Sequence, residues 1–341
     1  MTRTLDCLVI EADVGERADV VLGRRIPGLS RRLARALALA GKLRIAGQRR
    51  PPSTRVALGE RLELELDDEL APGSTLELEP LAITDDFVYV AKPAGVHTVA
   101  LTPDQPGVLA SAVVARWPEC AEASDDPREG GAIHRLDFPT SGVVAFARSR
   151  EVWQRARAGF AEGRIAKLYL AVCHRRADRW PPALPSEGLE GWIAPAQARL
   201  DLPNSGVSMG NSRVLSLDPV RIRAPLGRGE VAGRVAVRLE GRRASSVIQP
   251  LAESLTDERW LVGVRLETGL RHQARVHLAW IGLPIVGDLD YGGDDRERAR
   301  TPRAIRLHAL MLDLSAVFRT EQPMVAPPDP EFWPASRVDP P

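Results

Sequence analysis

The sequence feature that most constrains this chain is the stretch IHRLDFPTSGVVAFARS, which occupies residues 133–149. It places one acid, Asp137, directly before the run FPTSG. Because the proline and glycine of that run interrupt regular structure, we expect Asp137 on a loop that leads into a strand over Val143–Ala147. A carboxylate on a loop supported by a strand can act as a nucleophile or a general base. An isolated acid near an arginine such as Arg135 more often forms a surface ion pair. Other segments of the chain must therefore decide whether Asp137 is catalytic.

Length and composition indicate a globular protein with more than one domain. The chain has 341 residues, of which 44% are hydrophobic and 27% charged, and these values are ordinary for such proteins. The formal net charge of +1 predicts no global attraction to nucleic acid. The cysteines at positions 7, 120 and 173 form no CxxC pair, which favours a reducing compartment over a disulfide framework or a zinc site.

Targeting signals are missing from the printed sequence. Acids at positions 6, 11 and 13 interrupt the N-terminal apolar run that a signal peptide requires. No uncharged apolar run approaches the roughly 18 residues that span a bilayer. We therefore expect a cytoplasmic protein without membrane contact.

Residues 16–66 predict a compact basic module. Its order is a helix over 17–26, a second helix capped by Ser30 and ended by Gly41, and strands over 42–46 and 61–66 with a turn at Gly47. Acids become frequent only from Glu60 onward, so a positive face that binds phosphates is predicted. The candidate RNA contacts are Arg31, Arg32, Arg35, Lys42 and Arg44. The alternative is that these arginines form an ordinary solvated helix face. Arginine is common throughout this chain, whose only lysines are at positions 42, 92 and 167, so arginine richness alone does not indicate RNA binding.

The rest of the chain predicts a mixture of strands and helices. We expect strands over 85–92, 166–174, 260–267 and 304–317, a helix from a Ser149 cap to 164, and another through 281. Alternation along AKLYLAVCH directs Lys167 and Tyr169 toward a cleft while the other side packs. Residues 118–131 predict an acidic loop. Residues 175–230 are compatible with an insertion or with a run of short strands, and the Pro-rich tail from 323 is expected to be loosely held.

Separate segments supply polar groups that could act together. Asp137 is an acid on a loop, Tyr169 is an aromatic residue on a strand, and Arg275 is a cation near the start of a helix. A nearby Arg favours the ionised form of a carboxylate. A Tyr can stack on a base and exchange a proton.

These segments resemble the RluA-type pseudouridine synthases. The resemblance lies in VAKPAGVHTVA, IHRLDFPTSGVVAFARS, AKLYLAVC and LETGLRHQARVHLAWIGLPIVGDLDYGG, which stand in the order of that family. The basic module resembles the small RNA-binding module of a small-subunit ribosomal protein (S-four-like). The two resemblances cover roughly residues 15–66 and 83–315.

The resemblance implies a role for individual residues. Asp137 matches the catalytic aspartate, Tyr169 the active-site aromatic residue, and Arg275 the basic residue that pairs with the aspartate. Arg135 matches an arginine associated with displacing the target base. Further substrate-binding candidates in the matching segments are His134, Lys167, His272 and Gln273. The chain departs from the family pattern at Leu270, Arg271 and Ala274. These differences do not change the three chemical groups, so they affect how the RNA fits the site more than the reaction itself.

The implied reaction breaks the bond from uracil N1 to C1′, turns the base and rejoins it through C5. Nothing is oxidised or added, so neither a cofactor nor a metal is expected. The target uridine must leave its stack, at a cost of about a few kcal/mol. The expected partner is RNA, with large-subunit ribosomal RNA first and transfer RNA second, and the expected state is a monomer.

Other functional classes fit the sequence less well. A metal hydrolase would need ligands at helical spacing, but His272 and His277 are five apart and HExxH is missing. His134, Asp137 and Ser141 suggest a hydrolase triad, yet GxSxG is missing and triads combine distant segments. A catalytically inactive RNA-binding protein is the remaining alternative.

The predicted fold class is α+β. We expect an S-four-like module with an N-terminal arm over 1–68, a linker over 69–82 and a pseudouridine synthase domain over 83–320. The catalytic domain should contain a large mixed, mostly antiparallel sheet with flanking helices, and a Pro-rich tail should occupy 321–341.

Overall fold

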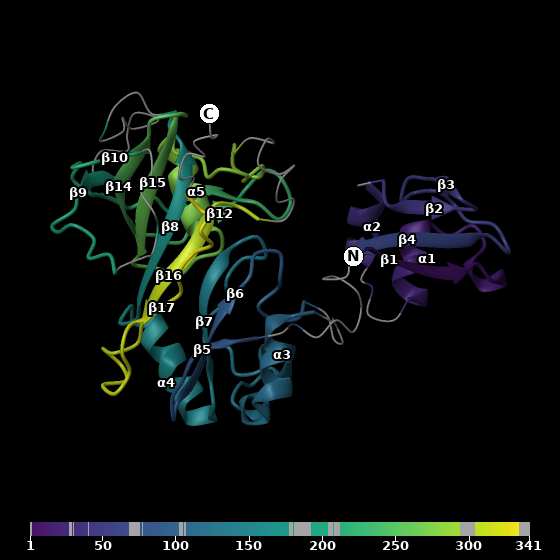
Figure 1. Cartoon of the computed structure of the whole chain (residues 1–341), viewed down its shortest axis with the longest axis horizontal. Helices are drawn as coiled ribbons and strands as arrows, with labels where there is room; N and C mark the ends of the chain where they lie inside the picture. The colour runs from purple at the N-terminus through teal and green to yellow at the C-terminus, as the bar shows by residue number, and fades with distance from the viewer. Residues whose placement is uncertain are drawn as a thin grey trace, which may run out of the picture. The chain divides into compact units, whose positions relative to one another are not determined.

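A computed structural model describes residues 2–26, 29, 31–39, 41–67, 76, 78–101, 105, 107–176, 180, 192–203, 207, 212–293 and 304–333 (Figure 1). The chain divides into two compact units. One contains residues 1–78, 99–121 and 125–130, and the other contains residues 79–98, 122–124 and 131–341. The predicted Ser30 cap and the side chain of Arg32 lie outside the described residues, as does most of the predicted linker.

The first unit is built on a small antiparallel sheet. Its strands are ordered β1 (Thr2–Leu8), β4 (Arg61–Asp67), β2 (Leu43–Ile45) and β3 (Gln48–Arg49), and its first helices are α1 (Ala18–Arg25) and α2 (Arg31–Leu39). Leu22 of α1 and Leu37 of α2 share one core with Leu43 and Leu64 of the sheet. The predicted order of elements for residues 16–66 is therefore observed. Gly47, with φ +77°, makes the β2–β3 turn.

Further elements belong to the segments that group with this unit. They are a 3₁₀ turn at Glu11–Asp13, helix α3 (Leu109–Arg116) and a 3₁₀ turn at Pro127–Glu129. A third 3₁₀ turn, Pro118–Glu122, reaches the division between the two units. The acidic loop predicted for 118–131 thus contains two such turns.

Two buried acids of the first unit each form ion pairs with two arginines. Asp13 is 1% exposed and lies 2.7 Å from Arg24 and 3.3 Å from Arg25. The fully buried Asp19 binds Arg17 at 2.9 Å and Arg31 at 3.5 Å. The acids before Glu60 are few, but these two already bind four arginines of this unit.

The buried Asp13 should make the first unit sensitive to acid. Burial alone would raise its pKa, but the Ile10 amide and the Arg24 and Arg25 guanidinium groups reverse this, and the pKa falls below the usual value. A lowered carboxyl pKa stabilises the fold above the unfolded value near 3.9, and this stabilisation is lost as pH falls toward the folded pKa. Urea unfolding should therefore find Asp13→Asn less stable than the parent at pH 7, and the difference should shrink as pH falls below about 3.9. A difference that does not shrink at low pH would contradict this.

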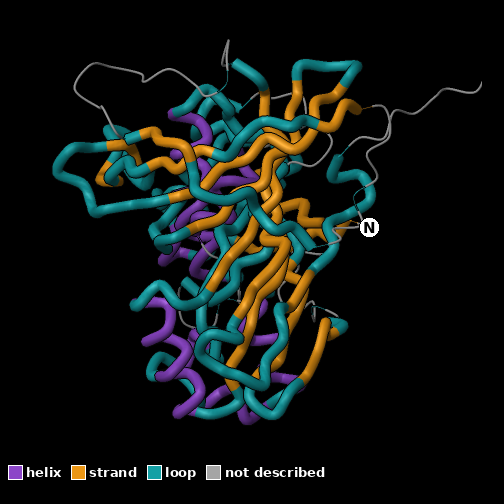
Figure 2. Tube along the Cα trace, turned by 90° about the vertical axis from the view of Figure 1, so that its left-hand side faces the viewer, coloured by secondary structure: helices purple, strands orange, loops and turns teal. Residues whose placement is uncertain are grey.

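The second unit is built on an 11-stranded sheet (Figures 1 and 2). The strands run in the order β5 (Pro80–Ile83), β6 (Phe87–Lys92), β7 (Ser141–Ala147), β16 (Leu307–Asp313), β8 (Ala166–His174), β15 (Arg259–Leu266), β14 (Ser246–Ser254), β11 (Val220–Ile222) and β9 (Ile193–Pro195). Strand β10 (Ser212–Val214) also pairs with β14, and β17 (Met324–Val325) with β16. Among the strands that the structure describes, β7 and β16 are the one pair that is parallel. The predicted α+β class with a mixed, mostly antiparallel sheet is confirmed.

Two helices and a hairpin complete this unit. Helix α4 (Arg150–Ala161) starts where the Ser149 hydroxyl accepts a hydrogen bond from the Val152 amide, as predicted. Its Trp153 packs in one core with Phe87 of β6 and Val143 of β7. Helix α5 (Gln273–Trp280) follows β15, and β12 (Leu226–Arg228) and β13 (Val235–Val237) form a separate hairpin. Within the described residues, no helix has both the length and the apolar character needed to span a bilayer.

Strand β8 differs from its prediction. It lies between β16 and β15, and its residues from Leu168 to Cys173 are buried whichever way they point. The alternation in AKLYLAVCH therefore does not separate a packed side from an open one. Only Tyr169 of this strand reaches a cavity.

Two other regions are more ordered than the sequence suggested. The described part of 175–230 forms short strands, three of which extend the large sheet, in agreement with the second of the two alternatives. The expectation of a loosely held tail from 323 was wrong for its described part. There β17 pairs with β16, and the side chains of Phe332 and Trp333 are 5% and 1% exposed. Residues 334–341 lie outside the described residues.

Candidate active site

The candidate site forms where β7, β16 and β8 meet α5. Gly142 faces Ala309 of β16, and Ala309 in turn faces Tyr169 of β8. Gly142 has φ +124°, and a Cβ atom there would collide with the Ala309 backbone. The glycine of the TSG motif is thus needed for the close approach of these strands. The Ser141 hydroxyl beside it bonds to Nδ1 of His308 at 2.9 Å, and Ser141 does not line the cavity that contains Asp137.

The loop that carries Asp137 is held by the segment after β6. The Thr98 hydroxyl accepts the Leu136 N–H and donates to the Leu136 carbonyl, both at 3.1 Å. Nζ of Lys92, 1% exposed, donates to the carbonyls of Pro93, Val96 and Phe138. Burial lowers the pKa of Lys92 to about 7, although the Asp137 charge opposes this shift. Residues on both sides of Asp137 are thereby fixed to a neighbouring segment.

Loss of the Thr98 hydroxyl should loosen this loop. Thr98→Val keeps the shape of the side chain but leaves the buried N–H and carbonyl of Leu136 without that partner. Each unsatisfied buried group costs about 1–3 kcal/mol, so the melting temperature and the catalytic rate should both fall. Thr98→Ser keeps the hydroxyl and is the matched control, which should retain both. Equal melting temperatures for the Val and Ser variants would contradict this role.

A cavity joins the predicted site residues. Its lining is Arg135, Leu136, Asp137, Thr140, Tyr169, Leu266, Leu270, His272, Gln273, Ala274, Arg275 and Leu307. The lining combines apolar side chains with several polar and charged ones that converge on the same space, as in small-molecule sites. Asp137, Tyr169 and Arg275, which come from three separate segments, are therefore brought together.

Arg275 is held mainly by a residue that the sequence did not single out. Its Nε and Nη2 atoms each bind Asp288 at 2.7 Å, and Nη2 also binds Asp290 at 3.1 Å. The distance from Nη1 to Oδ2 of Asp137 is 3.7 Å. Burial would lower the pKa of Arg275, but the Asp288 hydrogen bonds and the nearby acids raise it above its usual value. Arg275 is thus a fixed cation next to Asp137, with Asp288 as its principal partner.

Tyr169 contributes an aromatic ring and a hydroxyl that stays protonated. The residue is 7% exposed and lines the cavity. Burial, together with the Asp137 charge, raises the pKa of its hydroxyl well above the usual range. At neutral pH this side chain can therefore stack on a base and donate a hydrogen bond, but it is a poor proton acceptor.

His272 lies on the other side of Asp137. It precedes α5 with the left-handed φ of +57°, so the helix begins only at Gln273. Its Nε2 atom is 3.9 Å from Oδ1 of Asp137, and its Nδ1 atom is 2.7 Å from the Tyr291 hydroxyl. The Tyr291 ring also lies against the Arg275 guanidinium, 4.9 Å from its centre.

Three other predicted substrate contacts interact within the protein. Gln273 accepts from Thr268 and Leu270 and donates to Ser245 and Ser246, so it anchors the turn before α5. His134 accepts the Ala145 amide and packs on Phe160. Burial, with the charges of Lys167 and Arg157, lowers the pKa of His134 to about 3, so it is neutral.

Lys167 lies over the Phe160 ring at 5.3 Å, and burial lowers its pKa to about 8. Neither His134 nor Lys167 lines the cavity. Their predicted binding of substrate gains no support from this geometry. Arg135, by contrast, is exposed at the cavity mouth.

The candidate RNA contacts in the first unit differ in how they are held. Arg31 binds the buried Asp19, and Arg44 lies 3.4 Å from Glu65. Arg35 is exposed and Lys42 is half-buried. The predicted RNA-binding role of these residues stays a prediction.

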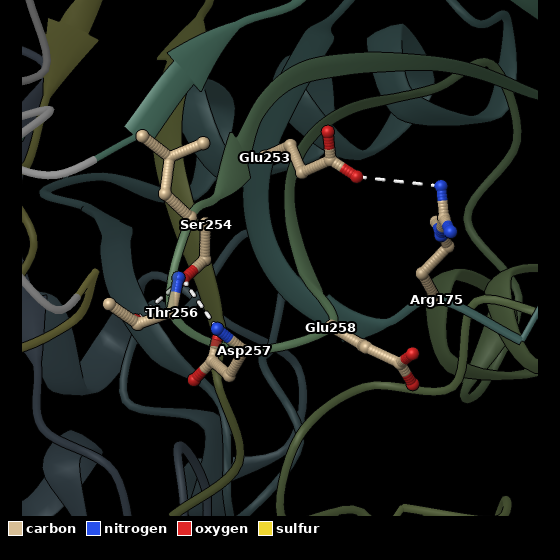
Figure 3. A pocket seen from close by; sticks show the side chains of 7 residues that line it. Arg175, Glu253, Ser254, Thr256, Asp257 and Glu258 are labelled. Carbon is tan, nitrogen blue, oxygen red and sulfur yellow. Dashed lines mark hydrogen bonds and ion pairs between the residues drawn. The ribbon is translucent and has the colours of Figure 1, made fainter.

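A second cavity lies away from these residues, beyond the end of β14 (Figure 3). It is lined by Arg175, Glu253, Ser254, Leu255, Thr256, Asp257 and Glu258. Two of its charged residues, Arg175 and Glu253, pair with each other at 3.4 Å, as Figure 3 shows. Within the described residues, His, Cys, Asp and Glu side chains form no group of three that could hold a metal ion.

Comparison with known proteins agrees with this site. Residues 86–280 match the family model described as RNA pseudouridylate synthase. A ribosomal large subunit pseudouridine synthase D from Xanthomonas campestris is 31% identical over 84% of this chain and 74% of its own length. The protein of the same name from Vibrio parahaemolyticus is 27% identical over 86% of this chain and 77% of its own length.

A solved structure agrees with the fold. Human RNA pseudouridylate synthase domain containing 1 is 24% identical and superimposes with a TM-score of 0.51, over 76% of this chain and 86% of that one. The matched segment in the sequence contains Asp137, Tyr169 and Arg275. The chain belongs to the RNA pseudouridylate synthase family, as an RluA-type isomerase that converts uridine in RNA to pseudouridine.

Proposed function

We propose that this enzyme acts on uridine in large-subunit ribosomal RNA and that Asp137 is the residue that reacts with the nucleotide. The observation that carries the proposal is a half-buried carboxylate, the one acid among the described residues that line the cavity, 3.7 Å from a buried cation. The printed names of the relatives in Xanthomonas and Vibrio support the ribosomal substrate.

In this proposal the site performs the isomerisation with its own side chains. The target base leaves its stack and enters the cavity, where Tyr169 stacks on it with about 1–3 kcal/mol. The Asp137 carboxylate acts at the ribose or the ring while the N1–C1′ bond breaks, and C5 then bonds to C1′. Arg275 stabilises the charge of the carboxylate throughout. Arg135, at the cavity mouth, occupies the position from which it could fill the space left by the displaced base.

Pseudouridine mapping in cells tests the substrate. Carbodiimide treatment and primer extension of ribosomal RNA should show one or more stops in the parent strain that disappear in a deletion strain. The stops should return with the wild-type gene but not with Asp137→Asn. Stops lost only from transfer RNA would overturn the ribosomal assignment while leaving the chemistry intact.

We further propose that the S-four-like module, over residues 1–68, holds RNA phosphates. Arg35, Arg49 and Arg50 are exposed on it. Changing all three to Gln should weaken RNA binding and flatten its dependence on salt, since each lost phosphate contact lowers the slope by roughly 0.7–0.9. Single-turnover rates at saturating RNA should change little. Arg319→Gln, an exposed arginine of the second unit, is the control. An unchanged salt slope in the triple variant would exclude this role.

A further inference from the structure

The reaction requires a group that takes the proton from C5 after the new carbon–carbon bond forms. Tyr169 is badly suited to this, because its hydroxyl keeps its proton at neutral pH. Asp137 is engaged with the nucleotide in the same step. We propose that His272 accepts the C5 proton through Nε2, with Tyr291 as the residue that orients it. This inference rests on the proposed role of Asp137, which fixes where the nucleotide lies.

The hydrogen bonds around the ring leave Nε2 as the basic atom. The Arg271 Nε–H points at Nε2 over 3.4 Å, which makes Nε2 an acceptor. Nδ1 then carries the proton and donates it to the Tyr291 hydroxyl at 2.7 Å. The same hydroxyl oxygen accepts the Val235 amide at 3.0 Å, and a hydroxyl oxygen can accept two such bonds. The Arg271 contact is long and exposed, so an entering nucleotide can displace it.

The position of His272 also fits a proton acceptor. The residue lines the cavity, and Nε2 is 3.9 Å from the carboxylate that we assign to the nucleotide. While it is ionised, a carboxylate at this distance favours the imidazolium by charge attraction. His272 also keeps a left-handed backbone, which costs a non-glycine residue about 1–3 kcal/mol.

The step balances without any further reactant. The C5–H bond breaks and its proton goes to Nε2. The electron pair of that bond restores the C5–C6 double bond, and the pair from C6–N1 returns to N1. The His272 imidazolium then releases one proton and N1 binds one, directly or through water, so the enzyme is restored and the net change is an isomerisation.

Several charged groups face His272 and set its protonation. Burial lowers its pKa, the Asp137 carboxylate raises it, Arg275 and Arg271 lower it, and Asp288 raises it. The net shift is downward, so the ring is neutral and able to accept a proton at neutral pH. Tyr291, the remaining neighbour, stays protonated because burial raises its pKa.

His272→Asn is the sharpest variant, because Asn tolerates the left-handed backbone and can still donate to Tyr291. Rates are measured on saturating RNA containing either ordinary or 5-deuterated uridine. Loss of the acceptor should slow turnover by about 10²–10⁴-fold with RNA affinity unchanged. The ratio of the two rates should also rise above that of the wild-type enzyme, because C5 proton loss becomes limiting. A merely structural defect would slow both substrates equally.

A second variant covers the case in which the Asn protein does not fold. His272→Gly suits the same backbone and leaves space for added imidazole, which should restore turnover in proportion to its neutral form. Tyr291→Phe should fall between the wild-type enzyme and His272→Asn. The proposal is overturned if His272→Asn turns over at nearly the wild-type rate. It is also overturned if the slowed variant shows an unchanged isotope ratio, or if imidazole does not restore the Gly variant. These results test only which group removes the proton from C5. The activity of Asp137→Asn tests the proposed role of Asp137 independently.

Discussion

Arg275→Met should produce a strongly destabilised and inactive protein. Arg275 is 4% exposed and Asp288 is 1% exposed, and the two form two hydrogen bonds of 2.7 Å. Removing one member of a buried pair leaves the other charge without compensation and costs about 3–5 kcal/mol. Chemical denaturation of the second unit, followed by near-UV circular dichroism, measures this loss.

A double variant separates stability from catalysis. Arg275→Met with Asp288→Leu removes both charges, and replacement of a buried pair by apolar side chains is often neutral for stability. We expect the double variant to regain most of the lost stability and to remain inactive, because Asp137 still lacks its cation. Arg275→Lys keeps the charge without the planar fork and should be impaired but measurable. Activity in the double variant, or full stability in Arg275→Met, would contradict this account.

The arrangement around Arg275 marks the limit of what the sequence could predict. The motif placed Arg275 beside Asp137, and the cavity brings the two together. The motif could not reveal that the guanidinium is divided among Asp137, Asp288 and Asp290. That division depends on how the segment GLPIVGDLDYGG turns back on α5. Its two acids were present in the sequence, but nothing in their spacing assigned them a partner.

Other errors came from local pattern rules that tertiary structure overrides. Strand β14 was not predicted, and it contains Pro250, which local rules disfavour inside a strand. The register shifts beyond Pro250, and the buried Gln249 side chain accepts a hydrogen bond from the Leu200 amide at 2.8 Å. The tail from 323 was expected to be loosely held because it is rich in proline. Its Trp333 is instead buried in one core with residues of β8 and β16. The left-handed His272 delays the start of α5, which single-residue propensity does not foresee.

Asp137→Asn should abolish pseudouridine formation without weakening RNA binding. Its side chain is 30% exposed in the cavity, and the Arg275 nitrogen that faces it is 3.7 Å away, too far for a hydrogen bond. The amide should therefore fit in the same place. The variant loses the negative charge and the nucleophilic or basic oxygen together. Because the two groups act as a unit, adding Arg275→Lys should reduce activity no further. Filter binding at equal salt is the control for affinity.

The most direct measurement is of the product itself. Purified wild-type and Asp137→Asn proteins are incubated at equal concentration with ribosomal RNA from the deletion strain. The RNA is then digested to nucleosides, and pseudouridine is quantified by mass spectrometry against RNA without enzyme. The account predicts new pseudouridine with the wild-type protein and only the background amount with the variant. Pseudouridine formed by Asp137→Asn above that background would contradict it.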